Sequence, residues 1–282
     1  MKMNKKKDMY FKSRLITTII VGLCGLAFLM PLLWMISASL QTNAQIYAKV
    51  FKWFPEKLMW KNYYEVFTSN HVPLLRLYGN SLLIAFVSIV GILLVSSLAA
   101  YAFAKIDFPG KNAVFAIFIG VMMIPSQITI IPRFLLFKEL GLYNTLWAVI
   151  LPSLFSVTSI FLLRQFFMGL PMELSESAFL DGAGHFRILT QIILPLTTPA
   201  LASLVIMNFV STWNDYMSPL IFLVNKKNYT ISLGIQYYNT SETPATELTM
   251  AIATCAVVPI LIVFFSCQKY FIESIARAGI KG

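Results

Sequence analysis

The chain has 282 residues, of which 58% are apolar and only 12% are charged. Soluble domains carry about 25% charged residues, so this composition excludes an ordinary soluble domain and indicates a protein that lies in lipid. The net charge is +10, but the basic residues stand at the ends of long apolar runs, where Lys and Arg set membrane orientation. A nucleic-acid-binding surface needs clustered basic groups on water-facing structure, so we expect no nucleic acid as a partner.

Long uncharged runs predict an all-α integral membrane protein with six transmembrane helices, since a helix needs about 20 apolar residues to cross the hydrocarbon core. The fifth run is shortened at its start, because Pro195 and Pro199 interrupt it. The first run is too long for a signal peptide, whose apolar region has about 7 to 15 residues. The predicted spans are residues 15–40, 81–104, 113–132, 140–163, 199–223 and 248–268.

Orientation follows from the basic residues near the spans. Six of them precede the first span, which places the N-terminus in the cytoplasm by the positive-inside rule. An even number of helices then returns the C-terminus to the same side. The predicted organisation is a cytoplasmic segment 1–14, a transmembrane domain 15–272 and a cytoplasmic tail 273–282, with the loop 168–195 between the fourth and fifth spans in the cytoplasm.

Small residues in the second span, Ser88, Gly91, Ala99 and Ala102, fall around Val95 at steps of three and four and predict a close helix contact. The segment 41–79 mixes aromatic rings with charges, which favours short helices at the membrane surface over a ligand-binding cap. The three cysteines lie within apolar stretches, and the two histidines fall on opposite predicted sides of the membrane. We therefore expect no disulfide, no metal site and no cofactor.

The loop 168–195 has local signals for a helix, a glycine turn and a second helix. Pro171 suits a first helical turn, Glu173 and Glu176 complement the helix dipole, and Gly182 can adopt the left-handed conformation that ends a helix. These signals predict a first helix of about three turns. A second helix begins near Phe186 and ends at Pro195. The same pattern also fits an amphipathic hairpin that rests on lipid headgroups.

Within this loop Glu176-Ser177-Ala178 is followed by Gly182, Ile192 and Leu194-Pro195. The chain thereby resembles the permease subunits of ABC importers, whose cytoplasmic motif reads Glu-Ala-Ala, three residues, Gly, nine residues, Ile, one residue, Leu-Pro. Ser177 replaces the first alanine of that motif. Further matching stretches, such as Phe161 to Phe167, are similar to the carbohydrate-uptake branch, in particular to the second permease of maltose-type transporters.

This resemblance implies a permease that forms, with a second permease, the path for a sugar or oligosaccharide in the bacterial cell membrane. An extracellular solute-binding protein would deliver the solute, and a separate cytoplasmic ATPase dimer would supply the energy. The short helix of the loop would be the coupling helix that contacts this ATPase. The residues implied in the contact are Glu176, Ser177, Ala178, Asp181 and Gly182. His185 stands at a position that the motif leaves free, and we interpret it as a surface residue.

No ATP site of its own is expected in the chain. Its Gly110-Lys111 pair is followed by Asn112, and Lys105 stands where the first glycine of a phosphate-binding loop belongs. No set of acids, histidines or an activated serine converges on one predicted membrane face either. We therefore predict a transport subunit that is not an enzyme and has no catalytic residues.

Asp215 lies within the fifth apolar region, where an acidic group is a candidate functional residue. Two interpretations stay open: a structural role in hydrogen bonding across helices, and a place in the translocation path. The candidate path residues are Asn208, Trp213, Asn214, Asp215 and Tyr216. In the following predicted external loop, the candidate contacts to a solute-binding protein are Tyr229, Tyr237, Tyr238 and Asn239, unless this loop is a solvated connector.

Two other functions remain as alternatives. A secondary transporter driven by an ion gradient would need charged residues within its spans or an internal repeat, and only Asp215 and no clear repeat are found. The other alternative is an ABC importer for a solute outside the carbohydrates, such as glycerol phosphate.

Overall fold

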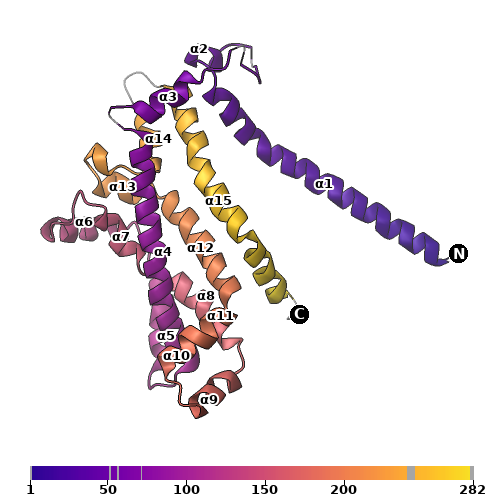
Figure 1. Ribbon diagram of the computed structural model, residues 1–282, viewed down its shortest axis with the longest axis vertical. Helices are drawn as coiled ribbons and strands as arrows, with labels where there is room; N and C mark the ends of the chain where they lie inside the picture. Colours follow the sequence, from indigo (N-terminus) through magenta and orange to yellow (C-terminus); the bar gives the residue numbers. More distant parts are fainter. Residues whose placement is uncertain (1, 51, 56, 71, 240–244, 280–282) are drawn as a thin grey trace. The chain divides into compact units, whose positions relative to one another are not determined.

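The computed structural model describes residues 2–50, 52–55, 57–70, 72–239 and 245–279, so Met1 and the last three residues of the predicted tail lie outside the described residues. Figure 1 shows the helices in chain order, and no strand occurs in the described ranges. The helices are α1 (Lys2–Ser39), α2 (Asn43–Ile46), α3 (Lys61–Thr68), α4 (Leu74–Lys105), α5 (Lys111–Val121), α6 (Ile130–Glu139), α7 (Trp147–Ser153), α8 (Val157–Met168), α9 (Glu173–Leu180), α10 (His185–Ile188), the π-helix η1 (Leu189–Ile193), α11 (Leu194–Leu196), α12 (Thr198–Trp213), α13 (Met217–Phe222), the 3-10 helix η2 (Lys226–Asn228), α14 (Ile231–Asn239) and α15 (Thr246–Gly279).

Four helical stretches in the described residues are long and apolar enough to cross a membrane. They are Arg14–Ser39 within α1, α4, the α7–α8 stretch Trp147–Met168, and Thr246–Lys269 within α15. A fifth results if His185–Leu196 and Thr198–Trp213, which are bent by 80°, count together as one span. The all-helical prediction is therefore confirmed, whereas the predicted six continuous spans are not.

The third predicted span, 113–132, is not one helix. Helix α5 ends at Val121, residues 122–129 form turns, and α6 begins at Ile130. Pro125 lies in the interruption; it has no N–H to donate, and its ring disfavours the helical conformation of the residue before it. An apolar run of sufficient length was therefore the wrong criterion at this place.

The fourth predicted span, 140–163, begins later, at Trp147. Gly141 has a φ of 70° and ends α6, where the N–H of Leu142 donates to the carbonyl of Phe137 at 2.9 Å. This is the bonding that a left-handed glycine makes at a helix end. Asn144 follows with a φ of 61°, so helical structure cannot continue through this segment.

The fifth predicted span, 199–223, is interrupted as well. Helix α12 ends at Trp213, and α13 begins only at Met217. Asp215 lies between them, and its Oδ1 accepts a hydrogen bond from the N–H of Ser218 at 3.2 Å. This bond satisfies a donor in the first turn of α13, as helix-capping carboxylates do.

The chain divides into two units, and the first comprises Met1–Ser69 and Ile235–Cys255. In this unit Asn62 of α3 fixes the segment after α1, because its Nδ2 donates to the carbonyls of Ser39 and Gln41, each at 2.9 Å. The short helices α2 and α3 thus occupy the segment in which surface helices were predicted.

The second unit comprises Asn70–Gly234 and Ala256–Gly282, and its centre is formed by α4, α8 and α12, which pack side by side (Figure 1). The predicted contact of small residues on α4 is confirmed at two positions. Ser88 Oγ lies 2.5 Å from Ser153 Oγ, and a Cβ added to Gly91 would lie 2.4 Å from a methyl carbon of Leu154. Gly91 therefore permits the close approach of α4 to the α7–α8 connection.

We expect the substitution Gly91→Leu to destabilise the protein by about 1–3 kcal/mol, because the larger side chain must displace Leu154. Thermal unfolding in mild detergent measures the effect. Gly79→Leu is the matched control on the same helix, since a Cβ at Gly79 would meet no atom within 4 Å and leucine is the better helix former. Equal unfolding temperatures for the two variants would contradict the close contact.

Candidate functional site

Helices α9 and α10 form a hairpin at one end of the second unit (Figure 1). Gly182 has a φ of 79°, which confirms the predicted left-handed glycine between the two helices. Helix α9 has 8 residues and is shorter than the predicted three turns, since it begins at Glu173 and Pro171 lies outside it. The second helix continues past Pro195 through η1 and α11 to Leu196, so Pro195 does not end it.

One face of the hairpin is buried in the apolar core of the second unit. Ala178 of α9 is 8% exposed, and Ile188 and Ile193 are fully buried. They belong to a cluster that also contains Leu189 of η1 and residues of α4, α8 and α12, namely Ala100, Tyr101, Leu163, Phe167, Ala200 and Leu204. The motif residues Ile192 and Leu194 pack against the same cluster. The hairpin is therefore held to the three central helices by apolar contacts.

The opposite face of the hairpin is exposed. Glu176, Ser177, Asp181 and Gly182 all lie on it, together with Leu180, whose side chain is 90% exposed. Four of the five predicted contact residues thus share one surface. Ala178 does not, because it packs inward, and its small size serves the packing of α9 on its own chain. Leu180 is therefore an apolar side chain that a partner could reach, and the carboxylates of Glu176 and Asp181 are exposed on the same face.

His185 takes part in a contact that sequence reasoning missed. Its ring is exposed, as predicted, but its Nδ1 lies 3.2 Å from the hydroxyl of Tyr101 on α4. The ring also packs edge-on against Phe179 of α9, with 4.8 Å between the centroids. His185 therefore connects α9 to α4. No sequence pattern indicated these contacts. Tyr101 is far from His185 in the chain, and the glycine turn separates Phe179 from His185.

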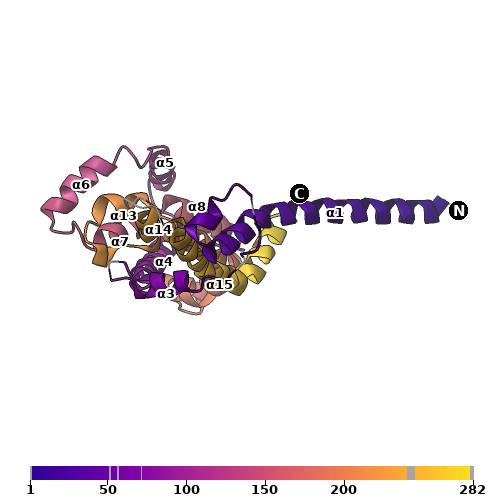
Figure 2. The ribbon, with the colours of Figure 1, turned by 90° about the horizontal axis from the view of Figure 1, so that it is seen from above.

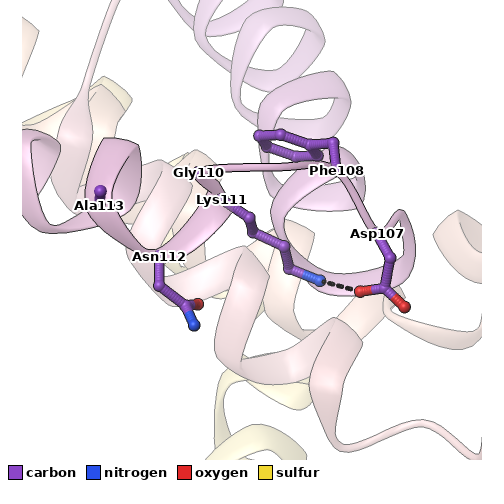
Figure 3. A pocket seen from close by; sticks show the side chains of 6 residues that line it. All are labelled: Asp107, Phe108, Gly110, Lys111, Asn112 and Ala113. Carbon is purple, nitrogen blue, oxygen red and sulfur yellow. Dashed lines mark hydrogen bonds and ion pairs between the residues drawn. The ribbon is translucent and has the colours of Figure 1, made fainter.

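Basic side chains fix the helix ends beside the hairpin. Lys105, at the end of α4, donates to the carbonyl of Leu170 at 2.7 Å, and Arg164 of α8 lies over the ring of Phe115 on α5, 4.0 Å from its centroid. In the shallow pocket at the α4–α5 turn, Lys111 points toward Asp107 and pairs with its carboxylate at 3.0 Å (Figure 3). The sequence alone gave no indication of these three contacts.

The candidate path residues are not gathered into one open site. Trp213 is 2% exposed, and its Nε1 donates to the carbonyl of Ala256 at 3.0 Å. The Nδ2 of Asn208 donates to the carbonyl of Leu204 at 2.8 Å. Asn214 is exposed, whereas Asp215 and Tyr216 are half-buried. Trp213 therefore packs helices together, and Asp215 has at least the structural role of holding the start of α13.

The candidate binding-protein contacts differ in exposure. Asn239 is exposed and Tyr237 is half-buried, but Tyr238 is 8% exposed, and burial raises the pKa of its hydroxyl. Tyr229 is half-buried, and its carbonyl accepts a hydrogen bond from Asn80 at 2.9 Å. Tyr238 therefore offers little surface to a partner, and Asn239 offers most.

Asn144 determines the path of the segment before Tyr229, and sequence reasoning gave it no role. Its Oδ1 accepts hydrogen bonds from the N–H groups of Val224 at 3.0 Å and Asn225 at 2.8 Å. Asparagine tolerates the left-handed conformation better than most residues, which suits the φ of 61° at this position. Its place in a glycine-containing turn between apolar runs was the available signal.

No group of three or more His, Cys, Asp or Glu side chains in the described part of the chain is placed to hold a metal ion.

Replacing His185 by alanine should loosen α9 from α4, because it removes one hydrogen bond and two ring contacts. We expect the α9 amides to exchange hydrogen for deuterium about fivefold faster, which corresponds to about 1 kcal/mol for local opening. Arg187→Ala is the control, since the bond of Arg187 to Gln191 lies within one helical segment. Unchanged exchange in His185→Ala would contradict this role.

Comparisons of the whole chain with known proteins all found components of membrane transport systems. A family model described as "Binding-protein-dependent transport system inner membrane component" matches residues 92–277. The arabinooligosaccharides transport system permease protein AraQ of Halalkalibacterium halodurans is 33% identical and covers 99% of this chain and 100% of that protein. The sn-glycerol-3-phosphate transport system permease protein UgpE of Brucella abortus is 30% identical over 92% of this chain and 94% of its own. A chain of a bacterial ABC transporter involved in the import of the acidic polysaccharide alginate has the same fold, with a TM-score of 0.81, 22% identity, and coverage of 91% of this chain and 95% of that one.

Proposed function

Because this chain belongs to the family of binding-protein-dependent transport system inner membrane components, we propose that it is a permease subunit of a bacterial ABC importer for a sugar or oligosaccharide. It forms the translocation path with a second permease, receives the solute from an extracellular solute-binding protein and is driven by a separate ATPase dimer. ATP is hydrolysed on the partner chain, so this subunit is a transport component and not an enzyme.

The observation that carries the proposal is the two-sided hairpin. Its inner face lies in the core of α4, α8 and α12, so a displacement of α9 is transmitted to the central helices by close-packed side chains. Its outer face offers Glu176, Ser177 and Asp181 around the exposed Leu180. We assign this face to the ATPase: Leu180 enters an apolar part of the partner's surface, and the carboxylates face basic groups there. Gly182 sets the turn, and Ala178 positions the helix.

The chain is a protein of the cytoplasmic membrane, as a member of an inner-membrane family with helices long enough to span a bilayer. Within it we propose six crossings, the third of which consists of α5, the turn residues 122–129 and α6. The segments 1–14 and 273–282 and the coupling loop 168–195 then lie in the cytoplasm, and residues 15–272 form the transmembrane permease domain. The six basic residues before the first span support this orientation.

The solute class follows from the relatives. The AraQ protein is described as an arabinooligosaccharides transport system permease, and we infer that the solute of this chain is also a carbohydrate. Glycerol phosphate is the second candidate, because the UgpE protein is described by that solute and is 30% identical. Selection between these solutes lies mostly with the binding protein, which is a separate chain.

The substitution Gly182→Val should leave the protein in the membrane and abolish solute uptake. A β-branched residue disfavours the φ of 79° by about 1–2 kcal/mol, so the turn that aims α9 changes. Gly184→Val is the matched control, since Gly184 lies in the same hairpin with ordinary extended backbone and open space around it. ATP-dependent uptake in membrane vesicles and copurification of the ATPase are the measurements.

Uptake in Gly182→Val at the level of Gly184→Val would overturn the coupling role. Uptake that needs a proton or sodium gradient and no ATPase would instead establish the secondary-transporter alternative.

Both termini should lie in the cytoplasm. Fusions of alkaline phosphatase, which is active only outside the cytoplasm, and of green fluorescent protein, which fluoresces only inside, test each end. We expect fluorescence and no phosphatase activity at both ends. Termini on opposite sides would mean an odd number of crossings and would remove α5–α6 as the third.

A further inference from the structure

The interruption between α5 and α6 is an exposed stretch of irregular backbone. All residues from 122 to 129 are exposed, and Figure 2 shows this connection at the margin of the second unit. It contains the large apolar side chains of Met123 and Ile128, which are 83% and 67% exposed. It also contains the polar residues Ser126 and Gln127. This combination is not that of a helix face turned to lipid.

The depth of this stretch follows from the length of α5. The ion pair of Lys111 with Asp107 marks the polar end of the helix (Figure 3), and α5 has 11 residues. At 1.5 Å per residue the helix rises about 16 Å, which is half of a hydrocarbon core of about 30 Å. Residues 122–129 thus begin near the middle of the bilayer.

Several polar groups of this stretch lack partners. Among the described residues, none forms a hydrogen bond with the N–H of Ser126 or Gln127 or with the side chains of these two residues. Irregular backbone at membrane depth occurs only where it is buried in protein or lines a water-filled cavity, because lipid satisfies no hydrogen bond. Lipid therefore cannot be the neighbour of this stretch.

We propose that residues 122–129 line the water-filled translocation path, and that Ser126 and Gln127 bind hydroxyl groups of a sugar solute there. The inference rests on the proposed function. Consecutive backbone N–H groups, a hydroxyl and an amide offer several donors and acceptors to a molecule rich in hydroxyls. Met123 and Ile128 provide apolar surface for the carbon faces of the rings. Binding near the midplane at an interrupted helix is the arrangement that transporters use repeatedly.

Ser126 and Gln127 are not among the candidate path residues that the sequence indicated in the fifth apolar region. Trp213 and Asn208 already have hydrogen-bond partners within the chain. Among the described residues, none forms a hydrogen bond with the side chains of Ser126 and Gln127, so these side chains are available to a solute.

The test uses single cysteines in the assembled transporter, in native membranes. The background replaces Cys24, Cys255 and Cys267 by alanine. Ser126→Cys and Gln127→Cys are treated with a charged methanethiosulfonate reagent, which reacts with thiolates in water. Ile117→Cys is the control, because Ile117 is 66% exposed but lies in the regular helix α5.

We expect both variants to react at least about tenfold faster than Ile117→Cys, since a thiol in lipid stays protonated. An arabino-oligosaccharide, a malto-oligosaccharide and glycerol 3-phosphate are tested as protecting solutes, and at least one of them should slow the reaction. In addition, Gln127→Leu should raise the KM of uptake about threefold to tenfold through loss of a hydrogen bond.

Three outcomes overturn the proposal: reaction as slow as in Ile117→Cys, protection by none of the three solutes, or rapid reaction only when the second permease is absent, which would place this stretch at the subunit interface. Copurification of the ATPase distinguishes failure of this inference from failure of the proposed function. With the ATPase bound and unreactive cysteines, the proposed function stands and this inference is wrong. With reactive, solute-protected cysteines and no ATPase, the path stands and the proposed energy source is wrong.

Discussion

The packing of the α9–α10 hairpin into the core of α4, α8 and α12 is the contact on which the rest of the account depends. Ala178, Ile188 and Ile193 lie in one cluster with residues of these three long helices. A surface helix without that contact would move independently of the membrane helices. With it, force on the exposed face reaches the central helices, because packed cores transmit displacement instead of absorbing it. The short side chain at position 178 allows α9 to lie this close.

Hydrogen-bond satisfaction is the second constraint. At two interruptions of the apolar spans, a side-chain oxygen accepts hydrogen bonds from the backbone N–H groups that the broken helix leaves unpaired. Asp215 accepts from the first turn of α13, and Asn144 accepts from two N–H groups of the segment that follows α13. In the interruption 122–129, by contrast, no side chain among the described residues accepts a hydrogen bond from the N–H groups of Ser126 and Gln127. The difference separates interruptions that shape the protein from the one that we assign to the solute.

The sequence predicted those features that depend on local chemistry. Gly182 was identified as a left-handed turn, and Ser88 and Gly91 as a close helix contact, because only small or flexible residues fit these roles. Continuous apolar runs predicted the long helices but not their ends or breaks. Pro125 and Gly141 interrupt runs that are apolar enough for lipid along their whole length. Composition alone could therefore not reveal where the helices break. The contact of His185 with Tyr101 and the inward direction of Ala178 arise from tertiary packing, which no local pattern encodes.

The central claim is that the outer face of α9 contacts the ATPase. A photoreactive amino acid at position 180, whose side chain is 90% exposed, tests it most directly, with position 19 in the apolar stretch of α1 as the control. After irradiation of intact cells, adducts are purified through the tagged chain and identified by mass spectrometry. The account predicts a protein adduct with a cytoplasmic ATPase at position 180 and none at position 19. Adducts only with lipid at position 180, or the same protein at both positions, would contradict it.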